Sequence, residues 1–172
     1  MSIFTSVEQA DSGDTTEIMR LLVNTAEWLL SKGSTQWNGL LRGEDACNTP
    51  EAINRGEVYI FKQNHLTAGM VMLLKEPNAW DREIWGERSV DQSAVYLHRL
   101  AINRKLAGQN IGRKMMEWVD TAVPSQLGKR VIRLDCLASL QVLNDFYRGL
   151  GYQLVGEGTN SSGVFSKFEK KV

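Results

Sequence analysis

A glycine-containing segment flanked by basic residues, between positions 94 and 114, has the composition of an anion-binding site. Residues 94–102 are typical of a strand, and Gly108 and Gly112 follow at the start of a helical pattern. The free amides and positive dipole at a helix start attract phosphate, and glycine lets it approach closely. The pattern therefore predicts a site for a pyrophosphate group. The basic residues around it are Arg104, Lys105, Arg113 and Lys114.

Two common nucleotide motifs are absent from this segment. The sequence has no G-x-G-x-x-G, and the preceding residues resemble a hairpin rather than a strand–helix–strand unit, which excludes the dinucleotide fingerprint. No Gly-Lys-Ser or Gly-Lys-Thr follows, which excludes the phosphate loop of nucleotide hydrolases. A simple tight turn remains the structural alternative, because two glycines before a helix are weak evidence alone.

The cysteines and histidines do not predict a metal site. Cys47 and Cys136 are far apart in the sequence and match no metal-binding spacing, and the chain has only 2 His. No basic residue type is placed beside Cys136 to activate its thiol, so a buried apolar role is expected for it. We expect both thiols to be reduced and inert, and no metal to be bound.

Hydrophobic periodicity predicts the elements that would position the site. The first half should contain a strand at 3–9, a helix at 15–32 with a capping box of Asp14 and Glu17, an ordered loop at 34–48 and a short helix at 49–55. A hairpin at 58–62 and 66–74 should follow, and then an irregular or partly helical connection at 76–92.

The second half alternates strands with helices. The patterns predict a strand at 94–102, a helix from 108 to 123 that ends at Pro124, a strand at 131–136, a helix at 140–150, and paired strands at 153–156 and 164–168. Strands joined through helices should be parallel neighbours, whereas hairpins are antiparallel. The sheet is therefore expected to be mixed.

Three motifs of the second half together resemble the GNAT superfamily of N-acetyltransferases. That family has a strand Leu-x-x-Leu-Ala-Val, a loop Gln/Arg-x-x-Gly-x-Gly/Ala, and a later helix that ends in Tyr-x-x-x-Gly-Phe/Tyr. Here these motifs are LHRLAI at 97–102, AGQNIG at 107–112 and YRGLGY at 147–152. The resemblance covers residues 94–156 closely. The sequence departs from the family at Ala107, where Gln or Arg is usual, at Asn110, where Gly is usual, and at Leu140, where Asn is frequent.

The resemblance implies a fold of the α/β (α+β) class. It implies one GNAT-like domain over residues 1–172, with a mixed, mostly antiparallel sheet of six to seven strands and about four flanking helices. The central strand pair should splay apart, so that a pantetheine arm can lie in the gap.

The resemblance also implies acetyl-CoA as the cosubstrate. The pantetheine arm would pair with the backbone of Leu100 and Ile102, and the pyrophosphate would bind the amides from Gly108 to Gly112. The residues expected to contact the cosubstrate are Leu100, Ala101, Ile102, Ala107, Gly108, Gln109, Asn110, Ile111, Gly112, Arg113, Asn144 and Phe146.

The implied reaction is direct attack of a primary amine, from a small molecule or peptide, on the thioester. Tyr147 matches the family's acid, and a phenol with a pKa of about 10 keeps its proton at neutral pH. His98 is the candidate base, and Tyr96 and Trp37 are candidate acceptor contacts. A core position for Tyr147 and a structural, hydrogen-bonded role for His98 are the alternatives.

Composition limits the partners. The 20 basic and 20 acidic residues give a formal net charge of zero, so neither nucleic acid nor an anionic membrane is an expected partner. No leader or spanning segment is evident, and a cytoplasmic location is expected. The β-rich C-terminal part offers an edge that could pair in a homodimer. Two other functions stay open: a catalytically inactive CoA-binding regulatory module, motivated by Ala107 and Asn110, and an interaction domain that uses its Trp-rich loops.

Overall fold

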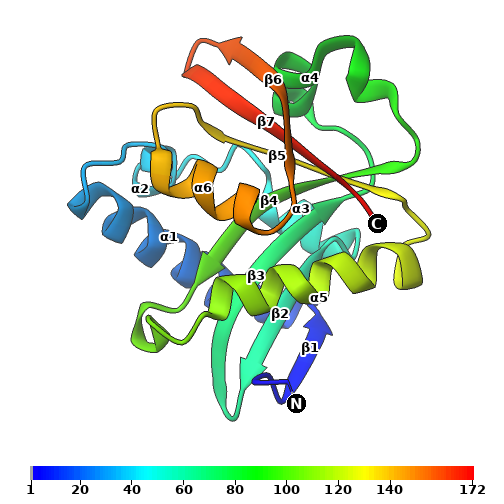
Figure 1. Cartoon of the computed structure of the whole chain (residues 1–172). Coiled ribbons are helices and arrows are strands. Elements are labelled where there is room, and N and C mark those ends of the chain that lie inside the picture. Colours follow the sequence, from blue (N-terminus) through cyan, green and yellow to red (C-terminus); the bar gives the residue numbers. More distant parts are fainter. Residues whose placement is uncertain (1) are drawn as a thin grey trace. The chain divides into compact units, whose positions relative to one another are not determined.

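The computed structural model describes residues 2–172 (Figure 1). Its elements alternate much as the periodicity predicts. In chain order they are β1 (Ser6–Gln9), η1 (Ser12–Asp14), α1 (Thr15–Ser31), α2 (Asn38–Leu41), α3 (Thr49–Asn54), β2 (Val58–Gln63), β3 (Leu66–Leu74), α4 (Ala79–Trp85), η2 (Gly86–Val90), β4 (Ala94–Ile102), η3 (Arg104–Leu106), α5 (Ile111–Gln126), β5 (Val131–Leu137), α6 (Gln141–Gly149), β6 (Gln153–Asn160) and β7 (Gly163–Lys171).

The strands form a mixed sheet, as predicted. Over residues 2–172 seven strands hydrogen-bond in the order β1-β2-β3-β4-β5-β7-β6. The pairs β1–β2, β2–β3, β5–β7 and β6–β7 are antiparallel, and β4–β5 is parallel. The described part of the chain has six α-helices rather than about four, because α2 is a short helix in a segment expected to be a loop and α4 forms in the connection expected to be irregular or partly helical.

The chain divides into two compact units, and the boundary crosses β3, β4 and α5. The first unit contains the residues up to Leu73 together with His98–Met115. The second contains Leu74–Leu97 and Met116–Val172. The paired part of β4, Ala94–Tyr96 against Val131–Arg133, belongs to the second unit. The predicted splay is a separation of residues 98–102 of β4 from β5. These two segments lie in different units, so the splay stays a prediction.

In the first unit, helices pack beside the antiparallel strands β1, β2 and β3. The helix α1 contacts α2 and α3, and α3 contacts β2. The buried face of α1 is mostly apolar, and its buried residues are Ile18, Leu21, Leu22, Thr25 and Ala26. Most of β2 and β3 is buried, so these strands provide a rigid support for the residues that follow β4.

In the second unit, β5 pairs along its whole length with β7, and β7 pairs with β6. Figure 1 shows α4 beside the orange and red β6–β7 hairpin, and α4 contacts both strands. Gly158 of β6 makes this contact possible, because a Cβ there would lie 2.4 Å from the carbonyl oxygen of Ile84.

Two details of the helix ends differ from expectation. The capping box is formed one turn earlier, by Asp11 and Asp14 around η1, and Asp14 makes no side-chain cap for α1. The helix α5 continues through Pro124 to Gln126. Proline removes one N–H but has a helical φ, so the last turn still forms.

Candidate functional site

The loop between β4 and α5 has the backbone expected of an anion-binding segment. Gly108 has φ +83° and Asn110 has φ +56°, both left-handed, and a Cβ on Gly108 would meet no atom within 4 Å. Asparagine adopts this conformation more readily than most residues, so Asn110 can replace the usual glycine. The helix α5 then starts at Ile111, and the first amides of a helix have no intrahelical acceptor. The loop is therefore open and lined with available amides.

The start of this loop is fixed by hydrogen bonds to β3. The amide of Asn103 donates to the Ala68 carbonyl at 2.8 Å, and its side-chain Nδ2 donates to the Thr67 carbonyl at 2.9 Å. The Asn103 Oδ1 accepts from the Lys105 amide at 3.0 Å, which caps η3. The residues 107–110 are exposed. A rigid base thus supports an exposed loop.

The basic residues around the loop differ in their surroundings. The Arg104 guanidinium lies 3.8 Å from the centre of a Trp28 ring, a cation–π contact that holds it in place. Lys105 and Arg113 are exposed, and Lys114 is half-buried. Exposed cations add attraction for phosphate that falls with ionic strength.

The strand β4 has the expected bounds. Ala101 is buried, and Leu100 and Ile102 are half-buried. The neighbouring β3 comes unusually close here, because a Cβ on Gly69 would lie 2.7 Å from the Ala101 carbonyl oxygen and 2.6 Å from the Met115 Sδ. Only glycine fits at that position, and it fixes the backbone that is expected to hold the pantetheine arm.

Arg99 interrupts the regular alternation of β4. Its φ is +55°, which is uncommon for a residue other than glycine and marks a local irregularity in the strand. Neighbouring residues of a regular strand point to opposite faces. Here His98 and Arg99 both contact the loop that follows α1: His98 contacts Cys47, and Arg99 contacts Trp37 and Asp45.

These contacts assemble a polar cluster, the α1–α3 loop cluster, of Trp37, Asp45, Cys47, His98 and Arg99. Arg99 Nη2 lies 3.6 Å from Asp45 Oδ1, and its guanidinium carbon lies 5.0 Å from the Trp37 ring centre. The side chains of Cys47 and His98 interact. The sequence predicted His98 and Trp37 but missed Asp45, Cys47 and Arg99, because no spacing rule connects the loop to β4.

The Cys47 thiol has a pKa below its ordinary value. Burial alone would raise this pKa, but the hydrogen bond from His98 and the charges of His98 and Arg99 lower it, whereas Asp45 opposes them. The expectation of an inert Cys47 thiol did not include these neighbours, and it stays a prediction. Cys136 behaves as expected, because burial, with a smaller effect of Asp135, raises its pKa to about 12.

In the second unit, Tyr147 lies on α6 among other aromatic rings. It is 7% exposed, and its ring centre lies 5.1 Å from Phe146, 6.1 Å from Tyr152 and 5.9 Å from Phe168. Burial, with smaller contributions from the charges of Cys136 and Asp135, raises the pKa of Tyr147. The phenol is therefore kept in its neutral, proton-donating form.

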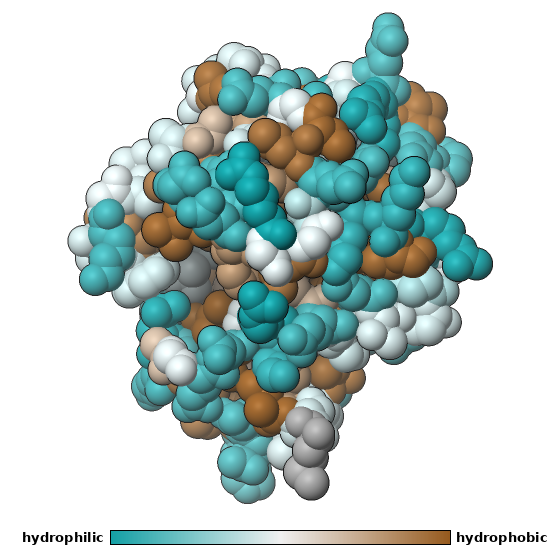
Figure 2. Space-filling view, viewed as in Figure 1, coloured by the Kyte–Doolittle hydropathy of each residue, from teal (hydrophilic) through white to brown (hydrophobic). Residues whose placement is uncertain are grey.

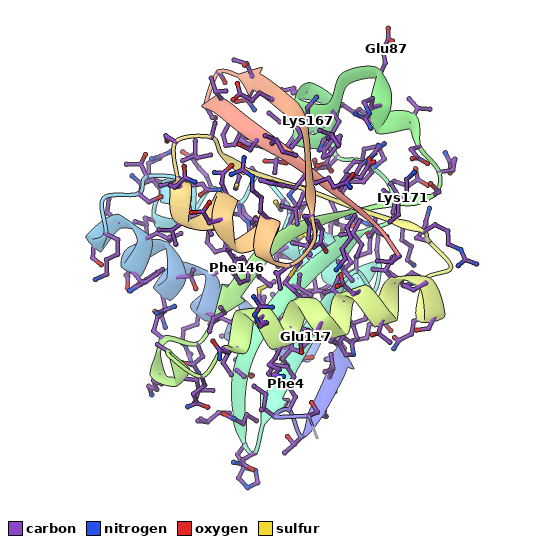
Figure 3. All side chains as sticks on the ribbon, in the orientation of Figure 1. Phe4, Glu87, Glu117, Phe146, Lys167 and Lys171 are labelled. Carbon is purple, nitrogen blue, oxygen red and sulfur yellow. The ribbon has the colours of Figure 1, made fainter. Side chains whose placement is uncertain are left out.

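The other predicted residues of α6 have different surroundings. Asn144 is buried, and its Nδ2 donates to the carbonyls of Leu137 at 3.1 Å and Leu140 at 2.8 Å. These bonds fix the turn that leads from β5 into α6. Phe146, labelled in Figure 3, is half-buried. Cosubstrate contacts of Asn144 and Phe146 stay predictions.

Tyr96 is buried in the second unit. Its hydroxyl donates to the Ser89 carbonyl at 2.8 Å and accepts from Arg133 Nη1 at 3.0 Å. Burial raises the pKa of Tyr96, although Arg133 opposes this effect. These contacts give Tyr96 a structural role, and its contact with the acceptor stays a prediction.

The tryptophans and acids of the 76–92 segment contribute mainly to packing or to the surface. Trp80 donates to Asp135 Oδ1 at 3.0 Å, and Trp85 is 2% exposed. Figure 3 shows the exposed Glu87 side chain extending away from the ribbon. Hydrophilic and hydrophobic residues are interspersed on the face seen in Figure 2.

Comparison with known proteins decides the family. The family model described as Acetyltransferase (GNAT) family matches residues 27–152, which include all three motifs. The chain belongs to the GNAT acetyltransferase family. This GNAT chain is 42% identical over 154 residues to the uncharacterized N-acetyltransferase YesJ of Bacillus subtilis (strain 168), and the match covers 90% of this chain and 84% of that protein.

Solved structures of GNAT proteins have the same fold. A GNAT family acetyltransferase from Listeria monocytogenes 4b F2365 is 32% identical with a TM-score of 0.82, over 97% of this chain and 94% of that one. The PaiA N-acetyltransferase of Thermoplasma acidophilum, solved in complex with coenzyme A, is 13% identical with a TM-score of 0.71, over 97% and 98% of the two chains. The predicted family and fold class are thus confirmed.

Across residues 2–172, no group of three or more His, Cys, Asp or Glu side chains is arranged to hold a metal ion. Within the same described part of the GNAT chain, every helix is too short or too polar to cross a bilayer. The cytoplasmic location and the homodimer stay predictions.

Proposed function

We propose that the protein transfers the acetyl group of acetyl-CoA to a primary amine of a small molecule or a peptide. The observation that supports this most is the loop of residues 107–112, with its two left-handed residues and the helix start behind it. Family membership supports the same donor, and the match extends through residues of both units. We propose that residues 1–172 act as one GNAT-like domain.

The donor would be held by backbone groups. The amides from Gly108 to Gly112 would bind the pyrophosphate, and the backbone of Leu100 and Ile102 would pair with the pantetheine arm. The open space around Gly108 leaves room for a phosphate against the backbone. Ala107 and Asn110 do not remove this capacity, because amides rather than side chains make the contact.

The chemistry would be direct attack of the neutral amine on the thioester carbonyl. His98 would take the proton of the amine, since an imidazole titrates near neutral pH. Tyr147 would give its proton to the departing CoA thiolate, since its buried phenol stays protonated.

Acceptor binding would involve the α1–α3 loop cluster. Trp37 offers an aromatic face, and Asp45 offers a carboxylate that is 15% exposed on its side chain. Both could contact an amine-bearing substrate, although Arg99 already balances the charge of Asp45. The acceptor is therefore expected to be recognised by shape and aromatic contact as much as by charge.

Acetyl-CoA binding is tested most simply by thermal unfolding. A ligand that binds only the native state stabilises it by about 2.7 kcal/mol when present at 100 times its Kd. We expect acetyl-CoA at millimolar concentration to raise the Tm, with adenosine as the unrelated control. No shift would contradict both the enzyme proposal and the idea of an inactive CoA-binding module. A shift without turnover of any amine would favour the module.

A further inference from the structure

Arg99 has a guanidinium edge whose hydrogen-bond donors are not saturated. Its Nε is buried and, within residues 2–172, has no hydrogen-bond partner. Its Nη2, on the same edge of the guanidinium plane, lies 3.6 Å from Asp45 Oδ1, an ion-pair distance that is too long for a hydrogen bond. We propose that this Nε–Nη2 edge binds a carboxylate of the acceptor, so that the amine acetylated by the protein is an amino acid or a similar amino carboxylate. This inference rests on the proposed function and names its substrate class.

Asp45 is held away from the Nε–Nη2 edge by its own backbone partners. Its Oδ1 accepts from the Cys47 amide at 3.3 Å, and its Oδ2 accepts from the Thr49 amide at 2.7 Å. These bonds fix both oxygens of the carboxylate to the turn before α3. Asp45 therefore offsets charge on Arg99 without saturating its donors. A second carboxylate can take the edge in the bidentate arrangement that a guanidinium favours.

The backbone and an aromatic ring set the orientation of the Arg99 side chain. Its φ of +55° is uncommon for a residue other than glycine, and such strain is concentrated at ligand sites. Its guanidinium carbon lies 5.0 Å from the Trp37 ring centre, a cation–π contact that holds the guanidinium in place. The edge is thus oriented before a ligand binds, which reduces the entropy lost on binding.

Other buried polar atoms near Arg99 also lack partners. Of the four such side-chain atoms within residues 2–172, three lie on Arg99 or on the segment 37–49 that it contacts: Arg99 Nε, Asn38 Oδ1 and Thr49 Oγ1. Buried polar groups are nearly always hydrogen-bonded, so a concentration of orphaned atoms needs an explanation. A bound polar ligand supplies the missing acceptor of Arg99. The Arg99 side chain remains 11% exposed, so a ligand can approach it, and contact with the Nε then requires the covering side chains to shift.

Arg99 lies next to the proposed path of the donor. It directly precedes Leu100, whose backbone is proposed to pair with the pantetheine arm, and it follows His98, the proposed base. One residue of a strand spans only about 3.3 Å. A carboxylate on Arg99 would therefore lie a short distance from the amine that attacks the thioester. An amino acid, in which few bonds separate the two groups, matches this spacing, whereas a polyamine has no anion to offer Arg99.

Matched amines test the inference in the wild-type protein. The pairs are lysine with cadaverine, ornithine with putrescine, and phenylalanine with phenethylamine, since the members of each pair differ only in the carboxylate. The full-length protein is assayed with each amine at saturating acetyl-CoA. We expect at least one amino acid to exceed its decarboxylated partner about 10- to 100-fold in kcat/KM, the range for hydrogen bonds to a charged group.

Two variants should change this preference in opposite directions. Arg99→Gln should remove it, mainly by raising KM for the amino acid; the lower basicity of an amino acid's amine is the same in both proteins and cannot explain such a loss. Asp45→Asn should lower KM for the amino acid, because a competing negative charge is removed while one acceptor oxygen is retained. If Arg99 only held Asp45 in place, the two variants would act alike. Arg42→Gln is the control in the same loop, with a side chain 62% exposed, and should leave the preference as it is.

Equal kcat/KM values within every pair overturn the inference and leave the proposed function intact. A preference that persists in Arg99→Gln also overturns it, since the carboxylate is then recognised elsewhere. If Arg99→Gln does not fold, as judged by its Tm, Arg99→Lys replaces it, because lysine keeps the charge but loses the planar fork and should still reduce the preference. Release of CoA thiol that no amine stimulates overturns both the inference and the proposed function.

Discussion

Tyr147 is placed where a phenol remains protonated. Its ring lies among Phe146, Tyr152 and Phe168, and burial is the main cause of its raised pKa. A neutral phenol in an apolar environment suits donation of a proton to a departing thiolate. The same surroundings also suit a core residue, and the change Tyr147→Phe separates the two roles.

The change Tyr147→Phe keeps the ring and removes the proton. We expect kcat to fall by a factor of about 100 or more, the range for loss of a general acid, with the Kd for acetyl-CoA unchanged. Tyr152→Phe is the matched control, since Tyr152 lies in the same aromatic cluster and its hydroxyl donates to Asp120 at 3.3 Å. Equal losses of kcat in the two variants would mean that Tyr147 acts only through packing.

At the scale of elements, Arg133 joins three segments of the second unit. It is 3% exposed on β5 and lies 2.9 Å from Glu169 of β7 and 3.4 Å from Asp91 after η2. Its Nη1 also donates to Tyr96. Removing one partner of a buried ion pair leaves uncompensated charge, which is more costly than losing a surface pair.

We therefore expect Arg133→Ala to lower the free energy of unfolding by about 3–5 kcal/mol, measured by urea denaturation. Arg130→Ala, an exposed change nearby, should alter it by less than about 0.5 kcal/mol. Similar urea midpoints for the two variants would refute the view that Arg133 holds together β5, β7 and the loop after η2 that contains Asp91.

The loop before α5 can be tested through its backbone. Gly108 and Gly33 have nearly the same φ, +83° and +85°, and in both cases a Cβ would meet nothing within 4 Å. Alanine at either position should cost about 1–2 kcal/mol of stability through backbone strain. Only Gly108→Ala should also raise the Kd for acetyl-CoA, measured by calorimetry. Weaker binding in both variants would show a global effect rather than a site at the loop.

Elements with a clear hydrophobic period or a clear start signal could be predicted from the sequence, and elements with neither could not. The bounds of β4 and the positions of α1, α3, α5 and the two hairpins follow from hydrophobic spacing. The helix α2 has four residues, too few for a period, and α4 lies in a polar segment. The capping box was predicted at Asp14 and Glu17, whereas Asp11 and Asp14 form it around η1, the 3-10 turn that leads directly into α1.

The site was predictable only in part, for a physical reason. A motif that is contiguous in the sequence, such as residues 107–112, can be recognised directly, because its own backbone amides form the expected binding site. The contact of Cys47 with His98 depends on the left-handed Arg99 and on the path of the loop after α1. Local spacing contains neither, so the partner of His98 could not be found before the fold was known.

At the scale of the whole molecule, all 4 Tyr residues have raised pKa values, with burial as the first cause. Above a pH of about 10 the unfolded chain loses these protons first, while the folded chain retains them. The folded state then binds more protons than the unfolded state, so stability falls as pH rises. We expect the urea midpoint to decrease from about pH 9 to 11, and a flat profile would contradict the buried placement of the phenols.

Acetylation of an amine by acetyl-CoA is measured most directly as release of the CoA thiol. This release is followed with a thiol reagent, against a panel of primary amines that includes polyamines, amino acids and short peptides. We expect turnover that saturates with at least one amine and is lost in Tyr147→Phe. Release that is the same with and without every amine, in a protein whose Tm rises with acetyl-CoA, would contradict it.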